Sequence, residues 1–276
     1  MFIYKKWDQF CRKLSKKGFK STDINTIVNT NNNQNFICLK HDVETAPKRA
    51  LKLAKIENKY GHKGTYYVQA YLLNNEKNIN ILRKIQELGH EVSYHHDVMD
   101  SNNGNITEAD LEFERNVKIF EKNNFPVNTT CQHGNPVMKR IGYSSNRDFF
   151  RDPVISKKYN NITEVMVNLK NRINCNFTYI SDAGYGWKII FDPENNDVIN
   201  TSDKDILIDL EELCENISTY KTIIISTHPH RWRSNFIFSI LNYYLFKIIK
   251  FIAKQIIKVP FVKNILARYY YLAKKI

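Results

Sequence analysis

The hydrophobic positions of this chain follow two spacings, one typical of helices and one typical of strands. An amphipathic helix is predicted over residues 3–17, because apolar side chains recur there at positions i, i+3, i+4 and i+7: Trp7, Phe10, Cys11 and Leu14. Further along, short apolar runs predict strands, and amphipathic stretches predict helices between them. The predicted strands are 36–42, 65–69, 91–95, 128–132, 177–181 and 220–227, and the helices between them are 46–60, 79–88, 107–123 and 203–217.

The repeated order of strand and helix predicts a mostly parallel sheet with right-handed crossovers. A barrel and a doubly wound sheet both satisfy this order. No glycine-rich phosphate loop follows a strand, which argues against a dinucleotide-binding fold. Thr107 is the expected N-cap of the helix predicted over 107–123. The region with the least regular pattern is 137–176, where residues 149–152 are a candidate short strand.

Polar side chains gather at the carboxyl ends of the predicted strands. Parallel α/β folds place their sites at that edge of the sheet. Seven of the eight histidines lie within a few residues of a strand end, and His62 alone is expected at an ordinary surface position. The side chains at these ends are Asp42, Glu44, His95, His96, Asp97, His133, Asp182, His228 and His230.

The first strand shows how such a site is built. Side chains alternate faces along a strand, so Asp42 and Glu44 point the same way and His41 points toward the core. Two adjacent carboxylates repel each other unless a cation or a shared proton relieves them. Imidazole and carboxylate groups are ligands for a zinc-like ion, which lowers the pKa of a bound water. The set therefore suits metal-assisted hydrolysis, with a second carboxylate as base and a histidine as acid.

Several motifs, in this order, resemble the polysaccharide deacetylase family with the NodB-homology domain, and in particular its branch near bacterial surface-polysaccharide genes. The resemblance covers roughly residues 36–232. The second and the closing motif are the most specific. The motifs are Lys40-His-Asp-Val-Glu44, Gly89-His-Glu-Val-Ser-Tyr-His95, Cys131-Gln-His-Gly-Asn-Pro136, Tyr179-Ile-Ser-Asp-Ala-Gly184 with Trp187, and Ser226-Thr-His-Pro229 with Trp232.

The resemblance implies a distorted seven-stranded (β/α) barrel that removes acetyl from an N-acetylated sugar with the help of a divalent metal ion, for which zinc is the expectation. Residues 1–232 would form this domain. Carried over by position, the roles fall on three groups. Asp42 would be the general base and His228 the general acid oriented by Asp182; Glu44, His95 and Asp97 would hold the metal; His133, Trp187 and Trp232 would face the substrate.

The chain departs from the family pattern at two positions. Met99 stands where the family has its second metal histidine, and a thioether is a poor ligand for such an ion. Spacing does not choose between Asp97, Asp100 and His96 as its replacement, and our prediction takes Asp97. Glu44 replaces the usual aspartate. A catalytically inactive, glycan-binding member of the same fold is the alternative function.

Charge is unevenly distributed along the chain. The net charge is +13, yet residues 231–276 hold ten Lys or Arg and no acidic residue, and the first 230 residues hold 31 basic and 28 acidic ones. The body is therefore near neutral, which argues against nucleic acid as a partner. Five scattered cysteines and an N-terminus without a long apolar segment favour a cytoplasmic protein.

The basic excess lies in a C-terminal helical tail, residues 233–276. Lysines at positions 247, 250, 254 and 258 form one stripe of a helix over 236–259, and its other faces are aliphatic and aromatic. A second helix is predicted over 261–276. The uninterrupted apolar stretch is too short to cross a bilayer. We expect the tail to lie on the anionic inner face of a membrane, and a helical pair packed on the barrel or in a dimer is the alternative.

Overall fold

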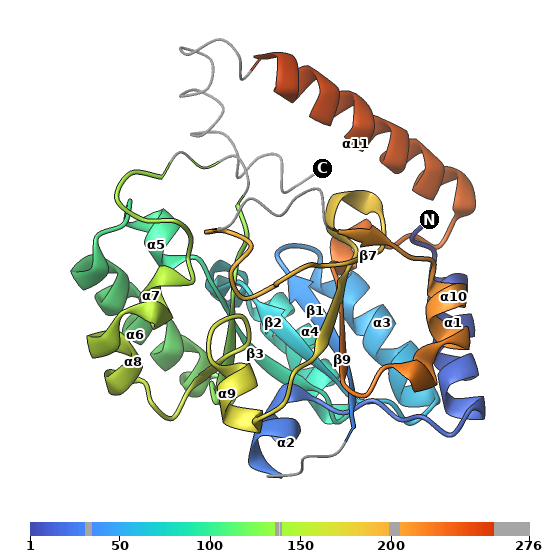
Figure 1. Ribbon diagram of the computed structural model, residues 1–276, viewed down its shortest axis with the longest axis horizontal. Coiled ribbons are helices and arrows are strands. Elements are labelled where there is room, and N and C mark those ends of the chain that lie inside the picture. Colours follow the sequence, from blue (N-terminus) through green and yellow to red (C-terminus); the bar gives the residue numbers. More distant parts are fainter. Residues whose placement is uncertain (31–34, 136–137, 139, 199–204, 257–276) are drawn as a thin grey trace.

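A single sheet forms the centre of the protein, and helices surround it (Figure 1). The computed structural model describes residues 1–30, 35–135, 138, 140–198 and 205–256. In the sheet, nine described strands follow the order β5-β4-β3-β2-β1-β9-β6-β7-β8. Helices α1, α3 and α10 lie on one side of the strands in this view, and α5 to α8 lie on the other.

Seven of the described strands pair in parallel, and the two at one end of the sheet are antiparallel. This confirms the predicted fold class, an α/β fold of the distorted seven-stranded barrel type. The parallel strands are β1 (Ile37–Val43), β2 (Gly64–Val68), β3 (Glu91–His96), β4 (Thr129–Gln132), β5 (Thr163–Glu164), β6 (Thr178–Ser181) and β9 (Ile223–Thr227); the antiparallel ones are β7 (Lys188–Ile189) and β8 (Ile206–Leu207).

The long helices lie close to where the hydrophobic spacing predicts them. They are α1 (Tyr4–Lys16), α3 (Pro47–Lys59), α4 (Glu76–Glu87), α6 (Ile106–Lys122) and α11 (Phe236–Ile256). The short helices are α2 (Ile24–Asn29), α5 (Val98–Ser101), α7 (Asp148–Arg151), α8 (Pro153–Lys158), α9 (Leu169–Ile173) and α10 (Leu210–Glu215), with 3₁₀ turns η1 (Ala70–Asn74), η2 (Ala183–Tyr185), η4 (Ile217–Thr219) and η5 (Pro229–Arg231).

Three local predictions are wrong. The candidate strand at 149–152 falls in helix α7, because its aromatic pair Phe149 and Phe150 packs into a hydrophobic cluster with Phe113 rather than alternating across a sheet. Asn105 rather than Thr107 caps α6, since the Asn105 side chain accepts hydrogen bonds from the first free backbone N–H groups. The helix predicted over 203–217 is shortened to Leu210–Glu215, and Asp209 caps it.

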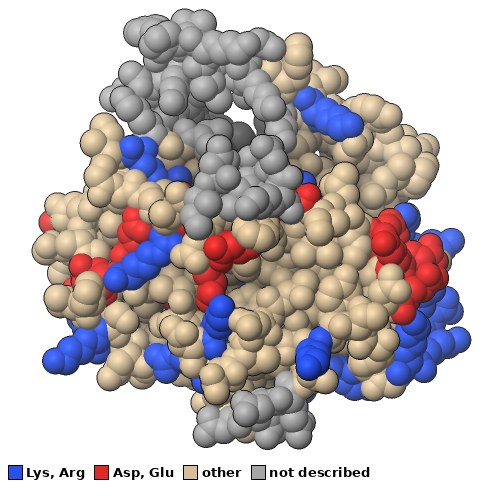
Figure 2. Space-filling view, in the orientation of Figure 1, with Lys and Arg blue, Asp and Glu red and all other residues tan. Residues whose placement is uncertain are grey.

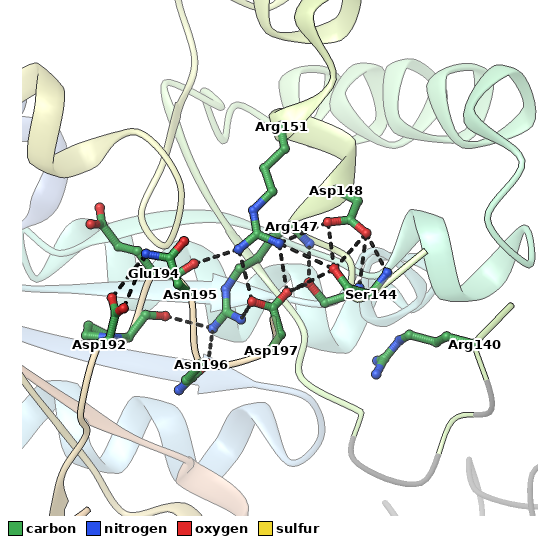
Figure 3. Close-up of polar contacts among 12 residues, drawn as sticks. Arg140, Ser144, Arg147, Asp148, Arg151, Asp192, Glu194, Asn195, Asn196 and Asp197 are labelled. Carbon is green, nitrogen blue, oxygen red and sulfur yellow. Dashed lines mark hydrogen bonds and ion pairs between the residues drawn. The ribbon is translucent and has the colours of Figure 1, made fainter. Parts of the chain in front are cut away.

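A polar clasp joins the segment after β4 to the segment after β7, two regions far apart in the sheet order. Asp197 lies at its centre and accepts hydrogen bonds from Arg151, 2.9 and 3.0 Å from its two oxygens, and from Ser145. Arg147 lies 2.8 Å from the same carboxylate and also donates to the carbonyl of Pro193. Figure 3 shows these side chains pointing toward Asp197 from both segments. The clasp therefore links the two halves of the sheet by side chains instead of strand pairing.

The C-terminal basic extension begins as helix α11, which runs across one end of the molecule (Figure 1). The second predicted helix, over 261–276, lies outside the described residues. Within the part of the chain that the structure describes, no helix is both long and apolar enough to cross a bilayer. On the face shown in Figure 2, basic and acidic side chains are interspersed over the body.

Candidate active site

Asp42 lies at the carboxyl end of β1 with its side chain buried beside that of Lys40. Residues two apart on a strand share a face, and Lys40 Nζ lies 2.5 and 2.7 Å from the two carboxylate oxygens of Asp42. Burial alone would raise the pKa of Asp42, but the Lys40 ammonium outweighs it and lowers that pKa to about 2. Asp42 is therefore an ionised, fixed carboxylate. Sequence reasoning missed Lys40, although its i, i+2 spacing from Asp42 was a usable signal.

Glu44, His95 and His133 come together from the ends of β1, β3 and β4. Their candidate ligand atoms all lie within 4.8 Å of one another. His133 Nε2 is 3.1 Å from Glu44 Oε1. Burial would raise the pKa of Glu44, but the neighbouring His133 holds it well below its usual value. Two imidazoles and a carboxylate are a donor set that suits zinc.

The orientation of His95 also fits a metal ligand. Its Nδ1 lies 2.9 Å from the carbonyl oxygen of Cys131, the residue opposite it on β4. A carbonyl only accepts, so Nδ1 carries the proton and Nε2 keeps its lone pair. Burial lowers the pKa of His95 to about 3, which keeps the ring neutral as a ligand must be.

A second group of ligand atoms at this place consists of Asp42, His95 and Cys131. It suits a metal less well. Burial raises the pKa of the Cys131 thiol, and a metal binds the thiolate. Asp42 is also engaged by Lys40 through both oxygens. The donor chemistry therefore favours the set of Glu44, His95 and His133.

His228 follows β9 and faces the two carboxylates of β1. Its Nε2 is 3.9 Å from Asp42 Oδ2 and 3.7 Å from Glu44 Oε1. The other ring nitrogen, Nδ1, lies 2.6 Å from Asp182 Oδ1. Asp182 thus fixes the His228 ring with its Nε2 directed toward the cluster.

Asp182 is held by four donors. Its carboxylate accepts from the Thr227 hydroxyl at 2.6 Å, the His228 backbone N–H at 2.9 Å, the His228 ring, and Arg231 Nη1 at 2.6 Å. Burial would raise the pKa of Asp182, and the Arg231 guanidinium together with His228 lowers it below its ordinary value. The carboxylate is therefore charged and immobile.

The remaining predicted site residues lie elsewhere. Asp97 precedes α5 and accepts a 3.4 Å hydrogen bond from Gln69 Nε2, and it is in neither candidate ligand group. Trp187 and Trp232, which were predicted to face the substrate, are buried against Phe2 and Trp7. Trp232 Nε1 donates to the Thr227 hydroxyl, 2.8 Å away, and so supports the residue that holds Asp182.

Behind the site, a buried carboxylate organises the opposite face of β1. Glu57 accepts from Trp7 Nε1 and from the Tyr66 hydroxyl, both at 2.8 Å, and its Oε1 is 2.9 Å from His41 Nε2. Burial would raise the pKa of Glu57, but its neighbours, of which His41 has the largest effect, lower that pKa to about 2. His41 thus faces the core, as predicted. His62 does not lie at the surface: it is buried, with its Nδ1 accepting from the Ser21 N–H.

No protein-family model matches the sequence, and no curated protein matches it. Solved structures do match. The chain is similar in structure to family 4 carbohydrate esterases and peptidoglycan deacetylases.

Three of these structures show the extent of the similarity. A family 4 carbohydrate esterase from Streptomyces lividans, in complex with acetate, is 14% identical with a TM-score of 0.43, covering 78% of this chain and 89% of its own. A Streptococcus mutans CE4 esterase is 14% identical with a TM-score of 0.47, and the match covers 85% of this chain and 89% of that one. The catalytic domain of a peptidoglycan N-acetylglucosamine deacetylase from Eubacterium rectale is 12% identical with a TM-score of 0.44, and the match covers 79% of this chain and 86% of that one. Because the sequence identities are 12–14% and the TM-scores are below 0.5, these similarities do not establish the chemistry of the site, which is argued from this chain's own side chains.

Proposed function

We propose that the protein is a metal-dependent hydrolase that removes acetyl from an N-acetylated sugar of a surface polysaccharide or a lipid-linked glycan precursor. One observation carries the proposal: the ligand atoms of Glu44, His95 and His133 lie within 4.8 Å of one another. The Asp42 and His228 side chains border this set. A zinc ion in this set would polarise the acetyl carbonyl and acidify a water.

The chain's own residues supply the proton transfers. Asp42, ionised and held by Lys40, accepts the proton of the attacking water. His228 then gives a proton from Nε2 to the amine nitrogen that leaves the acetyl carbon. The Asp182 carboxylate on Nδ1 stabilises the charged form of the ring before this transfer. The base and the acid thus come from different strands, with 3.9 Å between Asp42 Oδ2 and His228 Nε2.

Acetate release from N-acetylated chitooligosaccharides tests the proposal. Chelator should stop the release, added zinc should restore it, and Asp42→Asn should abolish it while the metal still binds. A stoichiometric metal content that falls in His133→Gln and stays unchanged in Asp97→Asn would support the ligand set. A protein that binds glycan but holds no metal and releases no acetate would instead be the inactive alternative.

We also propose that α11 rests on an anionic membrane surface. Its outward side chains are apolar and more than 40% exposed: Phe236, Ile237, Phe238, Leu241, Tyr244, Leu245, Ile248, Phe251 and Ile252. The opposite side packs on the body through Ser239 and through Phe246, whose ring lies 4.6 Å from that of Tyr185. An apolar face with lysine at its border suits a helix lying in the interface, and loss of vesicle binding on disrupting that face is its test.

A further inference from the structure

The first turn of α3 carries basic residues where helices favour acidic ones. This helix starts at Pro47, three residues after Glu44, and its first turn contains Lys48 and Arg49 but no acidic residue. Its N-cap, Ala46, makes no side-chain capping hydrogen bond. The N-terminal end of a helix is its positive end, so two further cations there are unfavourable unless an anion offsets them.

A second arginine meets Arg49 at this place from a different part of the chain. Arg49 Nη1 and Arg233 Nη1 both donate to the backbone carbonyl of His230. Among the described residues, neither guanidinium forms an ion pair with a carboxylate, whereas the nearby Arg231 is paired with Asp182. Burial, and then the charge of Arg49, lower the pKa of Arg233, as expected for two like charges held close together.

The pair lies between the candidate active site and α11. His230, whose carbonyl the two arginines share, has its ring 5.7 Å from that of His228. On the other side, the Arg233 backbone N–H donates to the Phe2 carbonyl, and its Nη2 and Nε lie 2.6 and 2.5 Å from the accepting side-chain oxygen of Asn242 on α11. Arg233 Nη1 also donates to the Trp232 carbonyl, 3.2 Å away. Both arginines are partly exposed, so a ligand can reach them.

We propose that Arg49 and Arg233 form a subsite for a phosphate group next to the deacetylation site. A guanidinium group binds phosphate oxygens in a planar, bidentate way, and among the described contacts Arg49 uses only Nη1, which leaves its Nε and Nη2 edge for a phosphate. Arg233, whose own donors are held by the protein, adds the second positive charge that offsets the double charge of a phosphomonoester. The ligand class is then an N-acetylated sugar that carries a phosphate, a choice of substrate that depends on the proposed function. A phospholipid headgroup presents the same chemistry from the adjacent α11 side.

The test compares a charged and a neutral ligand on each variant. General damage to the fold weakens the binding of both ligands and therefore cancels in the ratio of their dissociation constants. The dissociation constants of N-acetylglucosamine 1-phosphate and N-acetylglucosamine are measured by calorimetry on the full chain. Wild type should prefer the phosphate by at least about ten-fold, the value of one charge-assisted hydrogen bond or more. Arg49→Gln with Arg233→Gln should remove this preference, and the two Lys variants should retain part of it. Arg83→Gln, on the exposed side of α4, is the matched control.

A parallel arm measures sedimentation with phosphatidylglycerol and phosphatidylcholine vesicles. Loss of preference in the sugar arm assigns the subsite to a sugar phosphate, and loss in the vesicle arm alone assigns it to a headgroup. A wild-type protein without any preference, a preference that survives the double Gln variant, or Lys variants as impaired as the Gln ones would each overturn the proposal. Because binding is measured without turnover, failure of acetate release does not affect this result.

Discussion

Asp182→Asn should slow deacetylation by roughly ten- to hundred-fold. The change removes the charge that holds His228 through a 2.6 Å hydrogen bond to Nδ1. A hydrogen bond to a charged group contributes about 1.5–3 kcal/mol, which corresponds to this range of rate constants. The loss should appear in kcat rather than KM, because Asp182 contacts His228 and Arg231 and acts on the proton transfer.

A double-mutant cycle makes this prediction specific. If Asp182 acts through His228, then Asp182→Asn should cost little in a His228→Ala background, where no acid remains to be oriented. The assay is acetate release under saturating substrate, with thermal unfolding recorded for each variant. Asp148→Asn is the matched control, because it also removes a carboxylate from an arginine, Arg151, outside the site. Equal losses in the two backgrounds would refute the orienting role.

Two further predictions concern stability and the membrane. Glu57→Gln should lower the free energy of unfolding at pH 7 by about 3 kcal/mol, the equivalent of a pKa lowered from 4.5 to about 2. This difference, measured by urea unfolding, should shrink below about pH 4.5, where the carboxylate becomes protonated in the unfolded chain and its stabilising effect on the native state declines. The exposed Glu87→Gln should change the stability little at any pH. Equal unfolding midpoints for Glu57→Gln and wild type at pH 7 would contradict the reasoning. Leu241→Asp with Ile248→Asp, at side chains 56% and 55% exposed, should end co-sedimentation with anionic vesicles without changing the thermal midpoint. Loss of a dimer instead, seen by light scattering, would assign this face to a second copy of the chain.

The strands and long helices were predictable because their hydrophobic spacing reflects which face is buried. Where tertiary contacts decide the local structure, the pattern misled. Phe149 and Phe150 are adjacent, so a strand would place them on opposite faces, yet both are buried in one aromatic cluster with Phe113. His62 looked like a surface residue because nothing in its neighbourhood along the chain marks it as buried. Its partners, the Ser21 N–H and the Cys11 carbonyl, come from about forty to fifty positions earlier in the sequence.

For the candidate site, the sequence indicated which residues lie close together but not which role each of them has. Asp42 and His228, the predicted base and acid, and Asp182, the predicted orienting residue, are brought together as expected from strand ends in a parallel sheet. The third ligand could not be chosen from spacing along one strand. In the structure, His133 reaches Glu44 from the end of β4, which is separated from β1 by β2 and β3 in the sheet. This contact joins positions 89 residues apart in the sequence. Those assignments stay predictions until metal is measured.

The charges of the site suggest linked roles for Lys40 and His133: His133 completes the candidate ligand set, and Lys40 keeps Asp42 out of it. Met99 is packed in the hydrophobic core, so among the described residues the nitrogen donors in the candidate ligand groups are those of His95, on β3, and His133, after β4. Without a partner, the carboxylate of Asp42 would compete for the same ion, since it too belongs to a group of candidate ligand atoms with His95. Lys40 binds both of its oxygens and so keeps it available as a base. Replacing Lys40 by Met should therefore tighten metal binding while slowing acetate release, two effects of opposite sign that simple damage to the fold would not produce.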